Sequence, residues 1–322
     1  MSDDVGPPPP RYRLLRATLT LALLGLLALS LAGFLGRWSW HLDLCSHFRP
    51  HYLAGSLLLG GLALAARRRG PVALAAAGLA LNLVALTAGL GAPVPVDGPA
   101  LRLLVHNVYT PNDRYAEVAA AARAFEADVL CLQELDRAWL VGLQEAGLGD
   151  LDPVLLEPRQ DNFGIGVWLR PRAGLELVGH ELLRLSEHEL PALSLRLRVD
   201  GRPLELLVLH TLPPVSEENG DVRASQLQAA AARAAACQGP FVLTGDLNAT
   251  PWSRDFDALR EAGFADPLTG LGGSWPTFYP ELAGIPIDHC LLKGPVSATD
   301  ARYGAGAGSD HRALLVTLAV GE

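Results

Sequence analysis

The stretch that decides the fold of this chain is "PFVLTGDLNATP", residues 240–251, in which an apolar run leads into Asp246 and Asn248. A short apolar run bounded by glycine and proline predicts a buried β-strand. Side chains alternate along a strand, so Asp246 and Asn248 are expected to project to the same side. One ligand can then contact both, which makes this strand end a candidate ligand site.

Five further strand-like runs carry an amide, a carboxylate or an imidazole at one end. Between them lie alanine-rich helical stretches and polar loops, a pattern that predicts a mixed α/β domain with enough strands for two stacked sheets. A single polar residue at a strand end is usually a turn former or a helix cap. Six such ends in one domain favour a shared site, whose other members are His106, Asn107, Glu134, His210, Asp288, Asp310 and His311.

The apolar residues concentrate before residue 95, although the whole chain is 50% hydrophobic with a mean hydropathy of +0.23. Three runs there are predicted to span a membrane, at residues 14–35, 52–66 and 71–92, the second being the shortest. A cleaved signal peptide is the alternative for the first run, but that run is long and two more follow. We therefore expect a tail at 1–13, membrane helices over 14–92, a linker at 93–100 and an α/β domain over 101–322.

Arginines predict the orientation of these spans. Arg11 and Arg13 precede the first run, Arg16 lies at its start, and residues 67–69 are three consecutive arginines between the second and third. Basic residues favour the cytoplasmic side, so three spans place the C-terminal domain in the periplasm or at the cell exterior. The chain is therefore predicted to be a multi-pass membrane protein whose C-terminal domain lies outside the cytoplasm.

The C-terminal domain is acidic. Residues 101–322 contain 18 Lys and Arg against 30 Asp and Glu, a net charge of −12. Duplex DNA binding relies on several cationic contacts to phosphates, so this balance weighs against a nuclease without excluding one.

The runs "HNV", "DVLCLQE", "LHTLPP", "TGDLNATP", "IDHCLL" and "SDHRALLV", in that order, resemble the endonuclease/exonuclease/phosphatase superfamily. The membrane portion with its "LCSHFRPHY" loop is similar to membrane-anchored bacterial members of that superfamily. The resemblance implies a four-layer α/β/β/α sandwich, with a cleft at one end of two mixed sheets.

The resemblance also implies a divalent metal site. Glu134 would be the first metal ligand, Asn107 would help to hold the metal site or a phosphate oxygen, and Asp310 would add a second carboxylate. Oxygen ligands of this kind suit Mg²⁺, with Mn²⁺ as the alternative cofactor.

By the same resemblance, Asp246 would activate or orient the attacking water, and Asn248 would donate hydrogen bonds to the phosphoryl oxygens. His311 would contact the phosphate as an imidazolium whose pKa and orientation are set by Asp288. His210 would stabilise the phosphate or transfer a proton. Asn162 is expected either to contact phosphate in the cleft or to form a turn.

The function expected from these features is that of a membrane-anchored, divalent-metal-dependent phosphoester hydrolase with a water nucleophile. Its expected partners are the lipid bilayer and a phosphoester that is a lipid, a nucleotide or a nucleic acid, and no protein partner is inferred. A nuclease acting on DNA or RNA outside the cytoplasm is the first alternative. A membrane-anchored binding module without catalysis is the second.

Overall fold

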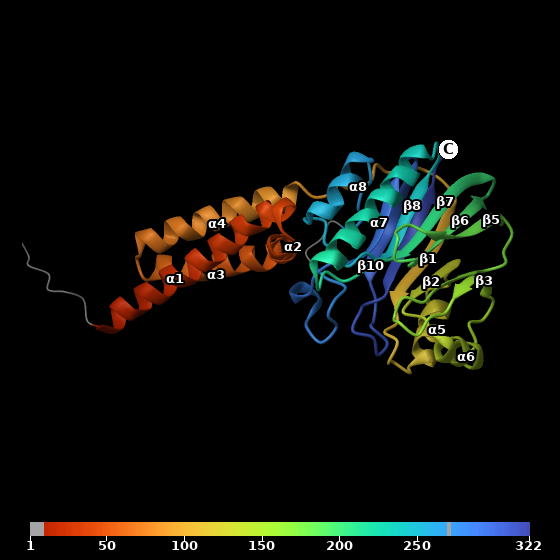
Figure 1. The fold of residues 1–322 in the computed structure, drawn as a ribbon, viewed down its shortest axis with the longest axis horizontal. Coiled ribbons are helices and arrows are strands. Elements are labelled where there is room, and N and C mark those ends of the chain that lie inside the picture. The colour runs from red at the N-terminus through yellow and green to blue at the C-terminus, as the bar shows by residue number, and fades with distance from the viewer. Residues whose placement is uncertain (1–9, 269–271) are drawn as a thin grey trace, which may run out of the picture. The chain divides into compact units, whose positions relative to one another are not determined.

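A computed structural model of the chain describes residues 10–268 and 272–322. It divides into two units, each described here by itself (Figure 1). The first unit runs to Gly89 and includes Trp252–Arg254, and the second holds Leu90–Pro251 and Asp255–Glu322.

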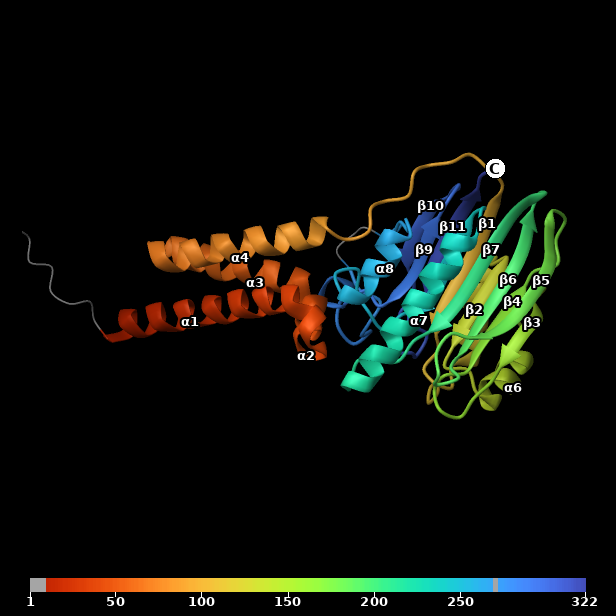
Figure 2. The same ribbon diagram turned by 45° about the horizontal axis from the view of Figure 1, so that its top comes forward.

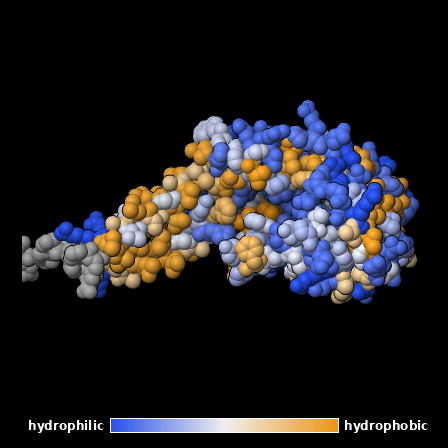
Figure 3. Space-filling view, turned by 60° about the horizontal axis from the view of Figure 1, so that its bottom comes forward, coloured by the Kyte–Doolittle hydropathy of each residue, from blue (hydrophilic) through white to orange (hydrophobic). Residues whose placement is uncertain are grey.

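The first unit is helical. Its α-helices are α1 (Pro10–Ala32), α2 (Trp40–Leu44), α3 (Arg49–Ala65) and α4 (Arg69–Thr87), with short 3₁₀ helices at Gly33–Trp38 and Cys45–Phe48. Helices α1, α3 and α4 pack against one another. Their outer surface is mainly apolar, as the orange atoms of Figure 3 show.

Two helical segments of this unit are long and apolar enough to cross a membrane, Arg13–Trp38 and Arg69–Thr87. Only 22% and 28% of their most apolar windows are buried, so most of that surface faces outward. The predicted span at 52–66 corresponds to α3, which has 17 residues and is not among these candidates. Three spans are therefore not established by length and composition, and the structure supports two candidates.

A polar cluster joins the three long helices. The Arg49 guanidinium is buried, donates through Nη1 to the Ser30 carbonyl at 2.6 Å, and lies 4.1 Å from the ring centre of Phe34. The Asn82 amide on α4 donates to Ser30 Oγ at 2.8 Å. Buried polar groups need such partners, so the cluster ties α1, α3 and α4 together.

The second unit contains two stacked mixed sheets (Figure 2). The six-stranded sheet has the order β10-β11-β1-β2-β4-β3, with the bounds Val296–Tyr303, Leu314–Val320, Ala100–Asn107, Val129–Gln133, Ile165–Leu169 and Asp152–Glu157. The five-stranded sheet has the order β5-β6-β7-β8-β9, with the bounds Leu175–Arg184, Pro191–Val199, Arg202–His210, Phe241–Asp246 and Asp288–Lys293.

Helices cover the outer face of each sheet. Helices α5 (Tyr115–Ala124) and α6 (Arg137–Ala146) pack on the six-stranded sheet through an apolar cluster that includes Trp139. Helices α7 (Glu217–Ala236) and α8 (Asp257–Glu261) cover the five-stranded sheet in the same way. A third apolar cluster fills the space between the sheets. The unit is thus an α/β fold of four layers, as its sequence predicts.

The segment that precedes β1 lies along this unit. The Val96 amide donates to Ser297 Oγ at 3.1 Å, and Arg202 Nη1 donates to the Asp97 carbonyl at 2.9 Å. Leu90 is buried in the cluster beneath α7. The expected linker at 93–100 therefore contributes contacts to the fold.

Candidate active site

Strand register brings the polar strand ends together. Strand β1 pairs with β2 in parallel, so Asn107 lies opposite Gln133, next to Glu134. Strand β7 pairs with β8 in parallel, so His210 lies opposite Asp246, and antiparallel β9 places Asp288 opposite Asp246. Carboxyl ends of parallel neighbours meet at one edge of a sheet, which explains why residues far apart in sequence converge here.

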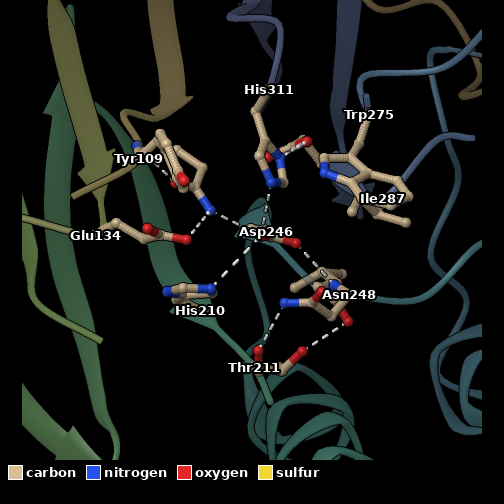
Figure 4. Close-up of polar contacts among 12 residues, drawn as sticks. Tyr109, Glu134, His210, Thr211, Asp246, Asn248, Trp275, Ile287 and His311 are labelled. Atoms are coloured by element: carbon tan, nitrogen blue, oxygen red, sulfur yellow. Dashed lines mark hydrogen bonds and ion pairs between the residues drawn. The ribbon is translucent and has the colours of Figure 1, made fainter. Parts of the chain in front are cut away.

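Asp246 lies at the centre of this site (Figure 4). Its Oδ2 accepts a hydrogen bond from Asn107 Nδ2 at 2.9 Å, and it lies 3.5 Å from His210 Nε2 and 3.7 Å from His311 Nε2. Burial and the charge of Asp288 raise the pKa of Asp246 above its ordinary 3.8, against the opposing effect of the two histidines. The carboxylate is therefore a better proton acceptor than an exposed aspartate.

Asn248 does not lie on the strand. Strand β8 ends at Asp246, and Asn248 follows in a turn with φ 46°, so the expected alternation of the two side chains does not apply. The turn forms because Asp246 Oδ1 accepts the Asn248 backbone N–H at 2.9 Å. Aspartate side chains often make such local hydrogen bonds, which compete with the continuation of a strand. Asn248 Nδ2 donates to the Thr211 carbonyl at 2.9 Å, which fixes the amide beside Asp246.

His311 and Asp288 form a buried ion pair. His311 Nδ1 lies 2.8 Å from Asp288 Oδ2. Burial opposes the charge on His311, but Asp288 and Asp246 outweigh it and raise the pKa of His311 to about 10. Burial also opposes the charge on Asp288, and the imidazolium reverses that effect and lowers the pKa of Asp288. His311 is therefore an imidazolium at neutral pH.

His210 has the opposite charge state. Burial lowers its pKa below the ordinary 6.5, although Asp246 favours the charged form. Its ring lies 4.9 Å from that of Phe163, and its Nδ1 has no hydrogen-bond partner within residues 10–268 and 272–322. His210 is therefore a neutral imidazole whose Nε2 faces Asp246 and whose buried Nδ1 lies on the opposite side of the ring.

Glu134 follows β2 in a left-handed conformation, with φ 59°. Its Oε1 accepts from Asn107 Nδ2 at 3.0 Å, and its Oε2 accepts from the Thr110 backbone N–H at 3.0 Å. A non-glycine residue with positive φ is strained and is often found at a functional site. Thr110 is a member of this site that the sequence analysis missed.

Asp310 lies at the edge of the site. Its Oδ2 accepts from Trp275 Nε1 at 3.0 Å, and its buried Oδ1 has no hydrogen-bond partner in the described part of the chain. An unpartnered buried carboxylate oxygen suits a cation, and the carboxylate oxygens of Glu134 and Asp310 fit the preference of Mg²⁺ or Mn²⁺. Asn107 differs from the prediction, because its Nδ2 faces Glu134 and its Oδ1 accepts the Tyr109 N–H at 3.1 Å, so it positions Glu134 and offers the ion no oxygen.

A second possible metal group consists of Asp246, Asp288 and His311, whose ligand atoms lie within 4.8 Å of one another. A histidine must be neutral to ligate a metal, whereas Asp288 keeps His311 protonated. The hydrogen-bonded ion pair accounts for this cluster, so the Glu134 side of the site is the better candidate.

The remaining histidines and Asn162 occupy other positions. His106 Nε2 contacts the His311 carbonyl at 3.1 Å and so positions the histidine backbone. His289 is buried, with Nε2 2.9 Å from the Ala249 carbonyl, which is a structural role. The Asn162 side chain is exposed, its φ is 65°, and it precedes the Phe163 that packs on His210.

Solved structures share this fold at low sequence identity. TDP2 from D. rerio, complexed with a single-strand DNA product, is 17% identical with a TM-score of 0.57, covering 68% of this chain and 98% of that one. The mannosyl-6-phosphatase Bt3783 of Bacteroides thetaiotaomicron is 19% identical with a TM-score of 0.55, covering 68% and 99%. The human Nocturnin catalytic domain with bound sulfate is 17% identical with a TM-score of 0.53, covering 70% and 96%.

Structural similarity at such low sequence identity is evidence for a shared fold only. No curated protein sequence matches the chain. Residues 104–311 match the sequence model of the Endonuclease/Exonuclease/phosphatase family, and this match spans more than half of the chain and every core residue of the site. The chain belongs to the endonuclease/exonuclease/phosphatase family.

Proposed function

We propose that the chain is a divalent-metal-dependent phosphoester hydrolase with a water nucleophile. The observation that carries the proposal is the Asp246 carboxylate, which faces one neutral and one protonated histidine at 3.5 and 3.7 Å. A carboxylate base, a neutral imidazole and a fixed imidazolium that lie together match the needs of attack on a phosphate anion.

Glu134 and Asp310 would hold the ion, and Asn107 would position Glu134. When bound, a divalent ion neutralises phosphoryl charge and lowers the pKa of a coordinated water. Members of this family generally use such ions, and the donor oxygens of the chain fit one. Asn107 also donates to both Glu134 and Asp246, so one amide aligns the metal side of the site with the base.

Asp246 acts on the attacking water. The proton of the water passes to Asp246 as the new oxygen–phosphorus bond forms and the ester oxygen–phosphorus bond breaks. Hydrogen bonds from Asn107 and from the Asn248 amide hold the carboxylate in place. The contacts of Asp246 with the two histidines, at 3.5 and 3.7 Å, are longer than ordinary hydrogen bonds, and catalytic contacts of this kind often shorten only in the complex.

His311 and Asn248 stabilise the charge that develops on the phosphoryl oxygens. The imidazolium of His311 keeps its Nε2–H directed at the centre of the site while Asp288 holds Nδ1. Asn248 Nδ2 uses one hydrogen for the Thr211 carbonyl, which leaves the second for a phosphoryl oxygen. His210 would stabilise the phosphate or transfer a proton through Nε2, the nitrogen that faces Asp246, and the exposed Asn162 would contact phosphate.

The direct test is turnover of bis-p-nitrophenyl phosphate with Mg²⁺, with Mn²⁺ and with EDTA. We expect metal-dependent release of p-nitrophenol and a loss of about 10²–10⁴-fold in kcat/KM for Asp246→Asn, because the general base is removed. Asp257→Asn is the matched control, because this exposed aspartate contacts Arg260 away from the site. Metal-independent turnover, or an Asp246→Asn variant as active as the control, would contradict the proposal.

A nuclease is the second candidate, favoured by the similarity to TDP2 with its single-strand DNA product. The net charge of −12 over residues 101–322 opposes it, because nucleic acid binding gains most from cationic contacts. Hydrolysis of supercoiled or single-stranded DNA that exceeds hydrolysis of small phosphodiesters would favour this candidate. A folded chain that binds phosphate but hydrolyses no ester would favour a binding module.

We further propose that α1, α3 and α4 cross the membrane and place the second unit outside the cytoplasm. A helix of 17 residues is about 25 Å long, within the range of short spans, which supports α3 as a third crossing. An alkaline phosphatase reporter at the C-terminus should be active, and a cytoplasm-specific fluorescent reporter should be dark. The reverse result would show an even number of crossings.

A further inference from the structure

A loop beside the site carries three large apolar side chains in water. Phe278, Tyr279 and Leu282 expose 73%, 53% and 76% of their surface. The rings of Phe278 and Tyr279 lie 4.7 Å apart, so they form one aromatic surface. Clustered exposed apolar side chains mark interaction surfaces more often than single ones do.

The loop is held in place by its backbone. Trp275 and Ile285 exchange backbone hydrogen bonds at 3.2 and 2.7 Å, which closes the base of the loop. Arg312 reaches into it and donates to the carbonyl of Tyr279 at 2.6 Å. A loop fixed in this way presents its apolar side chains to solvent as a stable feature and not as a frayed end.

The base of this loop belongs to the active site. Trp275 Nε1 donates to Asp310 Oδ2 at 3.0 Å, and the Thr277 N–H donates to the Asp310 carbonyl at 2.9 Å. Figure 4 shows Trp275 and Ile287 beside His311. Whatever docks on the loop is therefore held next to the reacting phosphate.

The charge of the loop identifies the kind of partner. Between Gly272 and Ile287 the one charged residue is Glu281, and no basic residue is present. Arg312, which reaches into the loop from outside this segment, is engaged by the carbonyls of Gly273 and Tyr279. Nucleic acid and anionic lipid both require cations, and the net charge of −12 over residues 101–322 repels them further. Aromatic and leucine side chains suit the boundary between lipid headgroups and acyl chains. Two helical segments of the same chain are long and apolar enough to enter a bilayer.

We propose that Phe278, Tyr279 and Leu282, here called the apolar loop, dock into a zwitterionic lipid surface. The phosphoester cleaved at the adjacent site is then carried by an amphiphile whose apolar part stays in that surface. The substrate assignment rests on the proposed hydrolase function, whereas the docking surface can be tested without catalysis.

Binding is measured with residues 90–322, which lack the apolar helices. This unit should fold alone, because 98% of the D. rerio TDP2 chain is covered by the same fold. Flotation with phosphatidylcholine vesicles should recover the unit, and adding phosphatidylglycerol should weaken recovery because both surfaces are then negative. Phe278→Ser with Leu282→Ser should reduce recovery at least tenfold. Val141→Ser with Val178→Ser is the matched control, since both valines are exposed on other elements, α6 and β5.

Catalysis is measured on two p-nitrophenyl phosphodiesters, a methyl ester in solution and a dodecyl ester in phosphatidylcholine vesicles. The loop variant should hydrolyse the methyl ester within about twofold of the parent and lose at least tenfold on the dodecyl ester. The control variant should match the parent on both.

The outcomes separate the two proposals. Loop-dependent flotation with no hydrolysis of either ester supports the docking surface and contradicts the hydrolase. The opposite result would be hydrolysis of both esters, no flotation, and a ratio of dodecyl-ester to methyl-ester rates that is the same in the loop variant and the parent. It would contradict the docking surface and leave the hydrolase proposal intact. Flotation that requires phosphatidylglycerol also contradicts the proposal, because the apolar loop has no cation to recognise it.

Discussion

The Nδ1 atom of His311 lies 2.8 Å from Oδ2 of Asp288, and both side chains are almost completely buried. The pair links β9 to the turn before β11, and thus connects the two sheets at the active site. Either charge buried alone would have no opposite charge to compensate it, so the two side chains must be buried together. Its consequences for stability and for catalysis can be measured separately.

The ion pair should give the unfolding free energy a defined pH dependence. The pKa of His311 rises from 6.5 to about 10 on folding, so its stabilising contribution is complete below pH 6.5 and is lost as the pH rises through 10. Asp288→Asn should lower the unfolding free energy of residues 90–322 by about 3–5 kcal/mol near pH 6. Urea unfolding with EDTA present measures this difference, which should shrink toward pH 10. A difference that is constant with pH would contradict the charged pair.

The same pair should set the alkaline limit of activity. Turnover needs ionised Asp246 and protonated His311, so kcat/KM should fall on the acid side at a pKa above 3.8 and on the alkaline side near a pKa of about 10. In Asp288→Asn the pKa of His311 should return toward its ordinary 6.5, because the neighbouring anion is gone. The alkaline limb of the rate profile would then move down by several pH units. An alkaline limb that stays in place would show that a group other than His311 sets it.

Four of the strands that the sequence predicts correctly, β1, β2, β7 and β8, are buried over most of both faces. Strands β1, β2, β7 and β8 read as continuous apolar runs because one face packs on the second sheet and the other beneath helices. Strand β5 is largely exposed, and its mixture of charged and apolar residues hides it among loops. The six polar strand ends were visible for the same reason, since each one terminates an apolar run.

Helix α6 was missed although its signals are present. Asp136 caps it by accepting the Trp139 N–H at 2.8 Å, and Gly147 follows its last residue with φ 71°. These are the usual marks of a helix start and end. Contacts made by backbone turns, such as those of Thr110 and Trp275, leave no such mark, because they depend on how separate loops meet at the end of the sheets.

Gly245 illustrates how local backbone geometry supports the site. It has φ 128°, and a Cβ atom there would lie 1.9 Å from the Leu209 carbonyl oxygen on the neighbouring strand. Gly245→Ala should therefore force β8 away from β7 and destabilise the unit by at least the roughly 3 kcal/mol at the upper end of backbone strain. Gly239→Ala is the control, because its nearest contact is a Pro203 side-chain atom at 4.0 Å. Thermal unfolding of both variants compares them, and equal melting temperatures would show that β8 can shift without cost.

Glu134→Gln should separate metal binding from folding. The amide keeps the shape of the side chain and can still accept the Thr110 N–H, but it removes the charge that would hold the ion. We expect the Mg²⁺ concentration for half-maximal activity to rise at least tenfold. The melting temperature without metal should fall by only a few degrees, since this half-buried side chain loses its charge and the hydrogen bond from Asn107 Nδ2. Glu126→Gln is the matched control, because Glu126 also has a positive φ of 53° but pairs with Arg102 on the surface. Isothermal titration with Mn²⁺ measures binding directly. An unchanged Mn²⁺ affinity in Glu134→Gln would indicate that the ion binds at the cluster of Asp246, Asp288 and His311 instead. Binding there would require His311 to lose its proton.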